Sequence, residues 1–152
     1  MVKEIFESLL EELGKVLNIP TLHPDRNRSC LIQMPNDIQL QIEMDSYGQN
    51  ICLGCDLGPI PPGRYRANFF REALKANAQP SPLNGILAYS QKTEHVVLFE
   101  YLPLKDLTGE KIADALGPFM EKGILWKEAL SKGEIPALSG SHSSGGMFGL
   151  RP

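Results

Sequence analysis

Apolar residues recur every three or four positions at the start of the chain, and every two positions later on. Between them in the first segment lie the acidic residues Glu4, Glu7, Glu11 and Glu12. The apolar positions at helical spacing are Phe6, Leu9, Leu10, Leu13 and Leu17. This spacing predicts an amphipathic helix. Pro20 limits it, because the residue before a proline is disfavoured in a helix.

The period then changes from 3.6 to 2, which is typical of strands. The clearest run is 38–45, in which Ile38, Leu40, Ile42 and Met44 alternate with polar residues. Such alternation predicts an antiparallel sheet that is covered on one face. Segments 29–34 and 50–57 read as strands on either side, separated by turn residues at 35–37 and 45–48. Three strands joined by short turns predict a meander.

The second half of the chain repeats the change of period. A Gly/Pro-rich loop at 58–63 precedes a helix from Arg64 to about residue 78. Segments 86–90 and 95–101 then read as a hairpin, and the run 96–99 is apolar on both faces, which predicts a central strand. A last helix begins near Thr108, a good N-cap residue. Pro118 and Gly123 lie inside it and predict a bent helix or two short ones.

Together these elements predict an α+β fold. The expected order is α-β-β-β-α-β-β-α, a twisted antiparallel sheet of about five strands with three helices packed on it. Residues 1–136 are expected to form this domain. Residues 137–152 start with Ala137-Leu138-Ser139-Gly140 and are rich in Ser and Gly. This composition predicts a flexible tail.

Charge and composition argue against two classes of partner. The formal net charge is −3, so a nucleic-acid role is not favoured, although four basic residues lie on the second helix: Arg64, Arg66, Arg71 and Lys75. No run reaches the ~18 consecutive apolar residues of a membrane span. The start of the chain mixes acidic and apolar residues, unlike a secretory signal, so we expect a cytoplasmic protein.

The strongest candidate for chemistry is Cys52-Leu53-Gly54-Cys55, which could be half of a zinc site or a redox pair. On a continuous strand, however, positions 52 and 55 face opposite sides. Surface or capping roles are expected for the isolated histidines His23, His95 and His142, and a solvated face for Glu43 and Asp45. We therefore predict no catalytic, cofactor or metal site. A small-molecule or metal-dependent enzyme remains an alternative that rests on the two cysteines and the Gly-rich loops.

The two predicted helices at the start and middle of the chain carry more apolar surface than one face of a core can readily bury. Phe69 and Phe70 are adjacent on the second helix, so they point about 100° apart. One interpretation is that core and sheet cover all of this surface. The other is a dimer seam on the second helix and a partner groove beside the first.

Six stretches of the chain resemble the Tir-chaperone (CesT-like) class I chaperones of type III secretion. These are Phe6-x-x-Leu9-Leu10-x-x-Leu13-Gly14, the strand Ile38–Glu43, the step Leu57-Gly58-Pro59-Ile60-Pro61, the helix end Ala73-Leu74-Lys75-Ala76-Asn77, the hairpin at 86–101, and the final helix with Trp126. Each motif is mainly an apolar pattern, and the resemblance lies in their shared order over residues 2–132. Gly117-Pro118, Gly123 and the Ser/Gly-rich tail with Met147, Phe148 and Leu150 depart from the family pattern.

The resemblance implies a homodimer without a cofactor or catalysis. It would bind the non-globular N-terminal chaperone-binding region of secreted effectors, keep it secretion-competent and help target it to the secretion apparatus. The implied effector-binding residues are Phe6, Leu9, Leu10, Leu13, Leu31 and Gln33, of which we expect only part of the helical set to be exposed. The implied dimer interface consists of Phe69, Phe70, Ala73, Leu74 and Asn77. A regulatory module of the same fold that sequesters a regulator is the alternative.

Overall fold

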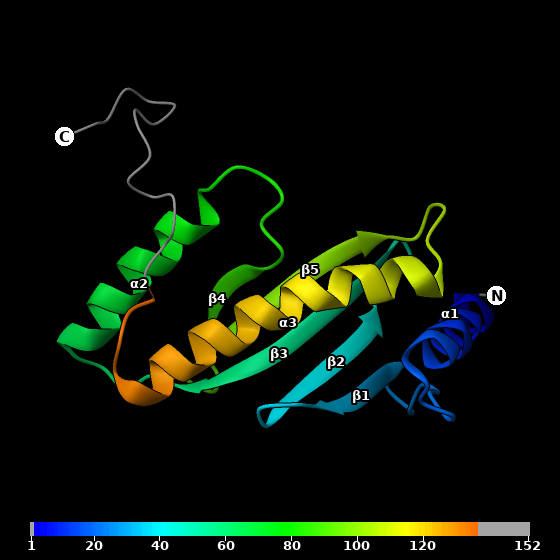
Figure 1. The fold of residues 1–152 in the computed structure, drawn as a ribbon, viewed down its shortest axis with the longest axis horizontal. Coiled ribbons are helices and arrows are strands. Elements are labelled where there is room, and N and C mark those ends of the chain that lie inside the picture. The colour runs from blue at the N-terminus through cyan, green and yellow to red at the C-terminus, as the bar shows by residue number, and fades with distance from the viewer. Residues whose placement is uncertain (1, 137–152) are drawn as a thin grey trace.

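The computed structural model describes the backbone of residues 2–136 and the side chains from Ile5 onward. It confirms the predicted α+β order (Figure 1). The elements are α1 (Val2–Leu17), β1 (Ser29–Met34), β2 (Ile38–Met44), β3 (Asn50–Pro59), α2 (Arg64–Asn77), β4 (Ile86–Ser90), β5 (His95–Pro103) and α3 (Gly109–Lys132). Among the described residues, no helix is both long and apolar enough to cross a membrane. The predicted boundary after residue 136 stays a prediction, because His142, Met147, Phe148 and Leu150 lie outside the described residues.

The five strands form one antiparallel sheet in the order β1-β2-β3-β5-β4. Every second residue of β2 is buried, as the alternation predicts. The buried face of the sheet, α1 and α3 share one core, with Leu10, Leu40, Leu53 and Trp126 among its fully buried side chains. Figure 1 shows α3 running along the sheet, with α1 at the β1 end and α2 beyond β4. In the strand order given above, β1 and β4 are the two edges of the sheet.

Helix α3 is a single helix, where the sequence predicted a bend or a break at Pro118. Thr108 caps it as predicted, with its hydroxyl accepting a hydrogen bond from the Lys111 N–H at 3.1 Å. Gly117 and Pro118 lie on the exposed side, where water can hydrate the carbonyl that lacks a helical partner. The neighbouring Leu116 and Phe119 are buried and hold the helix against the core. The prediction of two short helices is therefore wrong.

Two glycines let α3 approach its neighbours closely. At Gly109, a Cβ would lie 2.4 Å from the Cβ of Glu12 and 2.5 Å from the backbone nitrogen of Leu13. Only glycine permits this crossing of α1 and α3, which the Glu12 carboxylate strengthens by accepting a hydrogen bond from the Gly109 N–H at 2.9 Å. At Gly123, a Cβ would meet the Cys55 sulfur at 3.4 Å, so the small residue brings α3 close to β3.

Candidate functional site

The apolar stripe of α1 is part of the core. Phe6, Leu9, Leu10 and Leu13 are 1%, 5%, 0% and 0% exposed. The expectation that part of this set is exposed is therefore wrong for the single chain, because all four residues belong to the core and α1 packs mainly against α3. The large apolar side chains that α1 does expose are Ile5 and Val16.

The predicted contacts on β1 are accessible. Leu31 is 53% exposed and Gln33 is also exposed, both on the sheet face away from the core. Strand β1 pairs with β2 on one side only, so its outer edge presents backbone N–H and C=O groups that no other strand binds. An edge of this kind can accept an additional strand from another chain.

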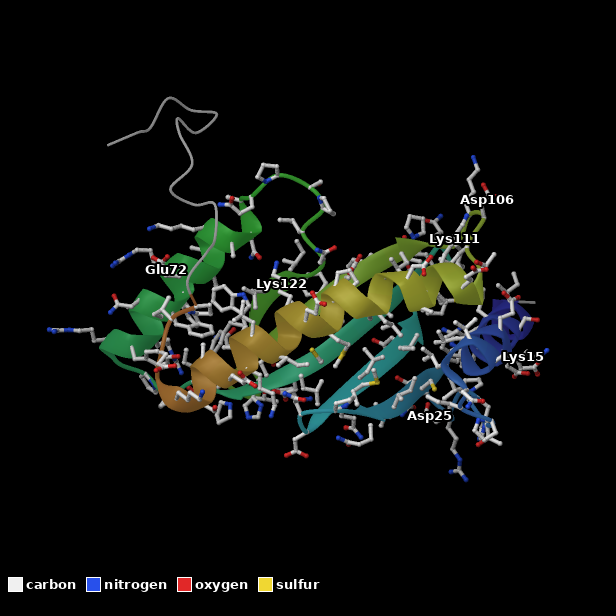
Figure 2. All side chains as sticks on the ribbon, in the orientation of Figure 1. Lys15, Asp25, Glu72, Asp106, Lys111 and Lys122 are labelled. Atoms are coloured by element: carbon white, nitrogen blue, oxygen red, sulfur yellow. The ribbon has the colours of Figure 1, made fainter. Side chains whose placement is uncertain are left out.

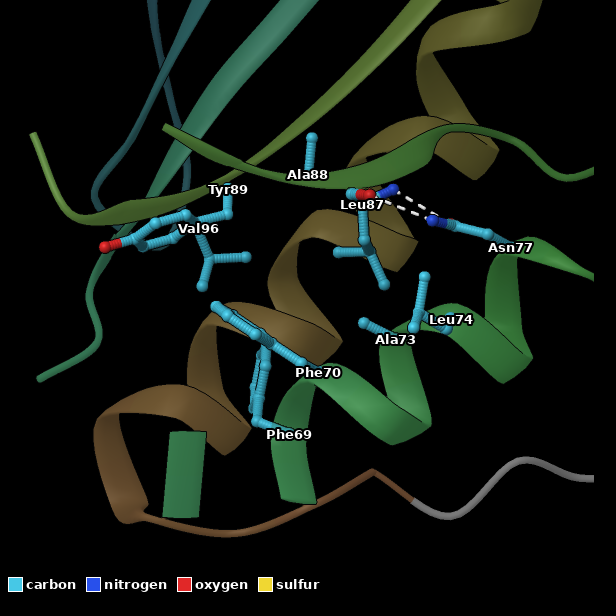
Figure 3. Close-up of a pocket in the computed structure, with 9 residues that line it drawn as sticks. All are labelled: Phe69, Phe70, Ala73, Leu74, Asn77, Leu87, Ala88, Tyr89 and Val96. Carbon is cyan, nitrogen blue, oxygen red and sulfur yellow. Dashed lines mark hydrogen bonds between the residues drawn. The ribbon is translucent and has the colours of Figure 1, made fainter. Parts of the chain in front are cut away.

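The five residues predicted for a dimer seam all line one pocket between α2 and β4 (Figure 3). Its volume is about 170 Å³, and β4 and β5 complete it with Leu87, Ala88, Tyr89 and Val96. The five residues differ in exposure. Phe69 and Ala73 are buried, Phe70 and Asn77 are half-buried, and Leu74 is 69% exposed. The pocket is therefore an apolar hollow with the exposed side chain of Leu74 at its rim.

Asn77 binds within its own chain. Its side-chain nitrogen donates to the Leu87 carbonyl at 2.9 Å, and its side-chain oxygen accepts from the Leu87 N–H at 3.0 Å (Figure 3). The amide thus takes the place that a neighbouring strand would take beside β4. Both edges of the sheet are therefore occupied at one residue, because Asp25 likewise binds the Ser29 N–H and carbonyl at the start of β1. Beyond Ser29, the β1 edge stays open to strand addition at Leu31 and Gln33.

Arg66 fastens α2 to the β4–β5 hairpin. It donates to the Ile60 carbonyl through Nε at 3.0 Å and also through Nη2, and it forms an ion pair with Glu94 at 3.2 Å. Its guanidinium lies 5.0 Å from the centre of the Tyr89 ring, a cation–π arrangement. Tyr89 in turn packs on Phe70, with ring centroids 5.2 Å apart. These contacts fix the wall of the α2–β4 pocket.

Lys122 holds the segment between α2 and β4 from the other side. Its ammonium donates to the carbonyls of Leu83 and Gly85 at 3.0 and 2.7 Å, reaching from α3 toward that segment (Figure 2). Burial lowers the pKa of Lys122 and raises the pKa of Glu100, and the opposite charge of each group acts against the shift of the other. No sequence pattern points to this lysine, because its partners are backbone carbonyls that are distant in the chain.

The cysteines support neither a metal site nor a redox pair. Cys55 is buried in the core, whereas Cys52 is half-buried on the opposite face, as the strand parity predicts. Burial raises the pKa of Cys52 to about 11 and that of Cys55 to about 12, so both thiols stay protonated at neutral pH. Among the described side chains, residues 5–136, there is no group of three His, Cys, Asp or Glu placed to hold a metal ion.

The polar candidates have structural partners. His95 Nδ1 lies 2.8 Å from a carboxylate oxygen of Asp56. Asp45 accepts hydrogen bonds from the Asn50 side chain at 2.8 Å and the Gln49 N–H at 2.9 Å, and these bonds lower its pKa. Glu43 accepts hydrogen bonds from Gln41 on the same strand at 3.3 Å and from the Ser29 hydroxyl on β1 at 3.4 Å. Each group therefore closes a turn or links neighbouring strands.

The sequence reasoning missed one surface, the second face of the sheet. Val97 and Phe99 gave the apolar run that predicts a central strand, and β5 does lie between β3 and β4. They nevertheless point away from the core, as the burial of Val96 and Leu98 shows, and Tyr101 beside them is exposed. The described helices pack on the other face, so these side chains lie on an uncovered surface.

Comparison with known proteins identifies the class to which this fold and these surfaces belong. The model of the Tir chaperone protein (CesT) family matches residues 8–127. The chain belongs to this family of chaperones. A search of curated protein sequences gives no significant match.

Solved structures with the same fold include three from complexes. The type III secretion chaperone SycH of Yersinia pestis with a YscM2 fragment matches with a TM-score of 0.60 and 16% identity, over 78% of this chain and 97% of that one. The HopA1–SchA chaperone–effector complex gives 0.64 and 19%, over 84% and 96%. The ExsC–ExsE complex gives 0.65 and 16%, over 84% and 95%. At these identities the likeness establishes the fold.

Proposed function

We propose that this chain is a type III secretion chaperone that binds the non-globular N-terminal region of a secreted effector. Its role is to keep that region secretion-competent and to help bring it to the secretion apparatus. The observation that carries the proposal, beyond family membership, is the edge of β1, which pairs with no other strand beyond β2 and has Leu31 exposed beside it. An extended effector segment would gain backbone hydrogen bonds along β1 and selectivity from its side chains.

The proposed assembly is a homodimer formed through α2 and β4. In a two-fold dimer the same patch faces itself, so the apolar pocket and the exposed Leu74 of one protomer meet their counterparts. Asn77 holds β4 to α2 by binding the backbone N–H and carbonyl of Leu87. Because these backbone groups are already bound, the proposed contacts between the protomers are made by side chains. Phe6, Leu9, Leu10 and Leu13 then act as core residues that position α1 beside β1.

The proposed site has no catalytic role. Binding through an open strand edge and an apolar pocket requires neither a cofactor nor an ionised nucleophile, in keeping with the protonated state of the two thiols. We place the protein in the bacterial cytoplasm, where effectors await secretion.

The test uses a secreted protein that co-purifies with the full-length chain from its native cell. Its N-terminal region should suffice for binding, and Leu31→Glu should weaken binding more than tenfold, because the new charge faces an apolar contact. Leu125→Glu is the matched control, since Leu125 is 48% exposed on α3. A Leu31→Glu variant that folds and binds normally would contradict the β1 site. A captured partner that is never secreted would instead favour the regulatory alternative.

A further inference from the structure

One carboxyl group of β5 has an oxygen that is buried without a hydrogen-bond partner. Glu100 points to the same side of the strand as the buried Val96 and Leu98, because strand residues two apart share a face. Its Oε1 is buried and, among the described residues, has no hydrogen-bond partner. An ionised carboxylate is costly in such surroundings. Burial therefore favours the neutral acid and raises the pKa of Glu100 above its ordinary value.

The nearby cation binds other groups. Lys122 of α3 is the charge that acts on Glu100, and it opposes the effect of burial on the pKa of that carboxyl. Its ammonium nevertheless donates to the carbonyls of Leu83 and Gly85, at 3.0 and 2.7 Å. A carboxylate accepts a stronger hydrogen bond from an ammonium than an uncharged carbonyl does. The observed arrangement therefore suits a protonated Glu100 better than an ionised one.

The elements packed around this pair bring no further charge to it. Leu53 of β3 lies opposite Glu100, and the next titratable side chain on that face of β3 is the protonated thiol of Cys55. Residues 78–88, between α2 and β4 and at the start of β4, include no titratable side chain. Among the described groups, Glu100 and Lys122 are each the one charge that shifts the pKa of the other.

The carbonyls that Lys122 binds belong to the segment that leads from α2 into β4. Gly85 comes directly before β4 and lies at the level of Glu100 in the strand register. A Cβ at Gly85 would lie 2.9 Å from Cδ1 of Leu98, so the segment is seated closely on the core. Strand β4 then forms one wall of the α2–β4 pocket. The position of this segment therefore helps to set the spacing between α2 and β4.

We propose that Glu100 and Lys122 form a proton-controlled latch on the segment between α2 and β4. With Glu100 protonated, the ammonium holds the carbonyls of Leu83 and Gly85, and the α2–β4 pocket keeps its observed shape. When Glu100 gives its proton to solvent, the buried anion draws the flexible lysine side chain to itself. The two carbonyls lose their partner, and the segment loosens.

The sign of the pH effect follows from the raised pKa of Glu100. The folded chain takes up this proton more readily than the unfolded chain, so the closed latch is fully stable below the ordinary pKa of a glutamate. Its stability is lost as the pH rises through the folded-state pKa. Because the latch positions a wall of the α2–β4 pocket, the proposed dimer should tighten on acidification. This last consequence rests on the proposed function, whereas the latch itself does not.

Glu100→Gln tests the latch, because glutamine keeps the shape of the side chain and cannot ionise. Glu121→Gln is the matched control, since Glu121 is exposed on α3 beside Lys122. Carbon-13 NMR of the side-chain carboxyl groups gives the titration midpoint of Glu100 in the full chain, and Glu100→Gln assigns its signal. The midpoint should lie above the ordinary glutamate value, and Lys122→Met should raise it further.

Amide exchange of residues 79–86 then reports the state of the latch, with all variants compared at the same pH. Above the Glu100 midpoint, these amides should exchange at least about fivefold faster in the unmodified chain and in Glu121→Gln than in Glu100→Gln. Below the midpoint, the three proteins should agree. An ordinary midpoint for Glu100, or equal exchange of Glu100→Gln and the unmodified chain above it, would overturn the inference.

Light scattering over the same pH range separates the latch from the proposed dimer. The unmodified chain should dissociate more readily above the Glu100 midpoint, and Glu100→Gln should not. A chain that is monomeric at every pH would count against the proposed dimer, while the exchange data still decide on the latch. A latch that opens in the exchange data without weakening the dimer would contradict its control of the α2–β4 pocket.

Discussion

Replacing Leu74 by glutamate should convert the proposed dimer to a monomer. Leu74 is 69% exposed in the single chain and lies at the rim of the α2–β4 pocket. In the proposed two-fold dimer, both copies of the new carboxylate would be buried against apolar side chains. An uncompensated buried charge costs about 3 kcal/mol or more, which weakens association more than a hundredfold.

Light scattering provides the measurement. The unmodified chain should have a molar mass of twice 16.8 kDa, and Leu74→Glu should approach 16.8 kDa. Leu125→Glu, which changes a similarly exposed leucine on α3, should stay dimeric. A Leu74→Glu variant that keeps the dimer mass at micromolar concentration would place the interface elsewhere.

Gly109→Ala should destabilise the fold by about 3 kcal/mol, a large part of the stability of a typical domain. The added methyl group would lie 2.4 Å from the Cβ of Glu12 and 2.5 Å from the Leu13 backbone nitrogen, too close for either to remain in place. Helices α1 and α3 would have to separate, which would loosen the buried Leu13 and Ile112 and lengthen the hydrogen bond to Glu12.

Urea unfolding gives the difference, and Gly117→Ala is the control. A Cβ at Gly117 meets nothing within 4 Å outside its chain neighbours. Alanine there gains helix propensity but precedes Pro118, so these opposing effects should leave the stability within about 1 kcal/mol of the unmodified chain. Equal effects of the two substitutions would show that the α1–α3 crossing adapts to a methyl group and is less tightly packed than the structure indicates.

The strands were predictable because a sheet covered on one face imposes a period of two. The clearest case is β2, in which each apolar residue is buried and each intervening residue is partly or fully exposed. The odd spacing of Cys52 and Cys55 likewise predicts that they lie on opposite faces of the strand, as they do. In α3, by contrast, Pro118 suggested a break, because the sequence does not reveal that its side of the helix faces water.

Periodicity shows that a face is apolar but does not show what covers it. In the sequence, both the α1 stripe and the pair Val97 and Phe99 are apolar, and the pattern does not distinguish a face that the chain covers from one that it leaves open. The chain itself buries the α1 residues Leu9 and Leu10, whereas it leaves Phe99 and Tyr101 uncovered. The pocket residues on α2 were predicted through the family resemblance, yet the bond of Asn77 to β4 depends on a contact ten residues away. Such pairings follow from tertiary structure and leave no local pattern.

Amide hydrogen exchange, measured on the full chain alone and with the captured N-terminal effector region, tests the central claim most directly. The chaperone account predicts new protection in β1 at Leu31 and Gln33, because their outward N–H groups would gain partners from the bound segment, whereas the Ser29 N–H already donates to Asp25. The amide of Leu87 in β4 should change little, since Asn77 already binds it. A tight complex with unchanged exchange throughout β1 would contradict binding by strand addition at this edge.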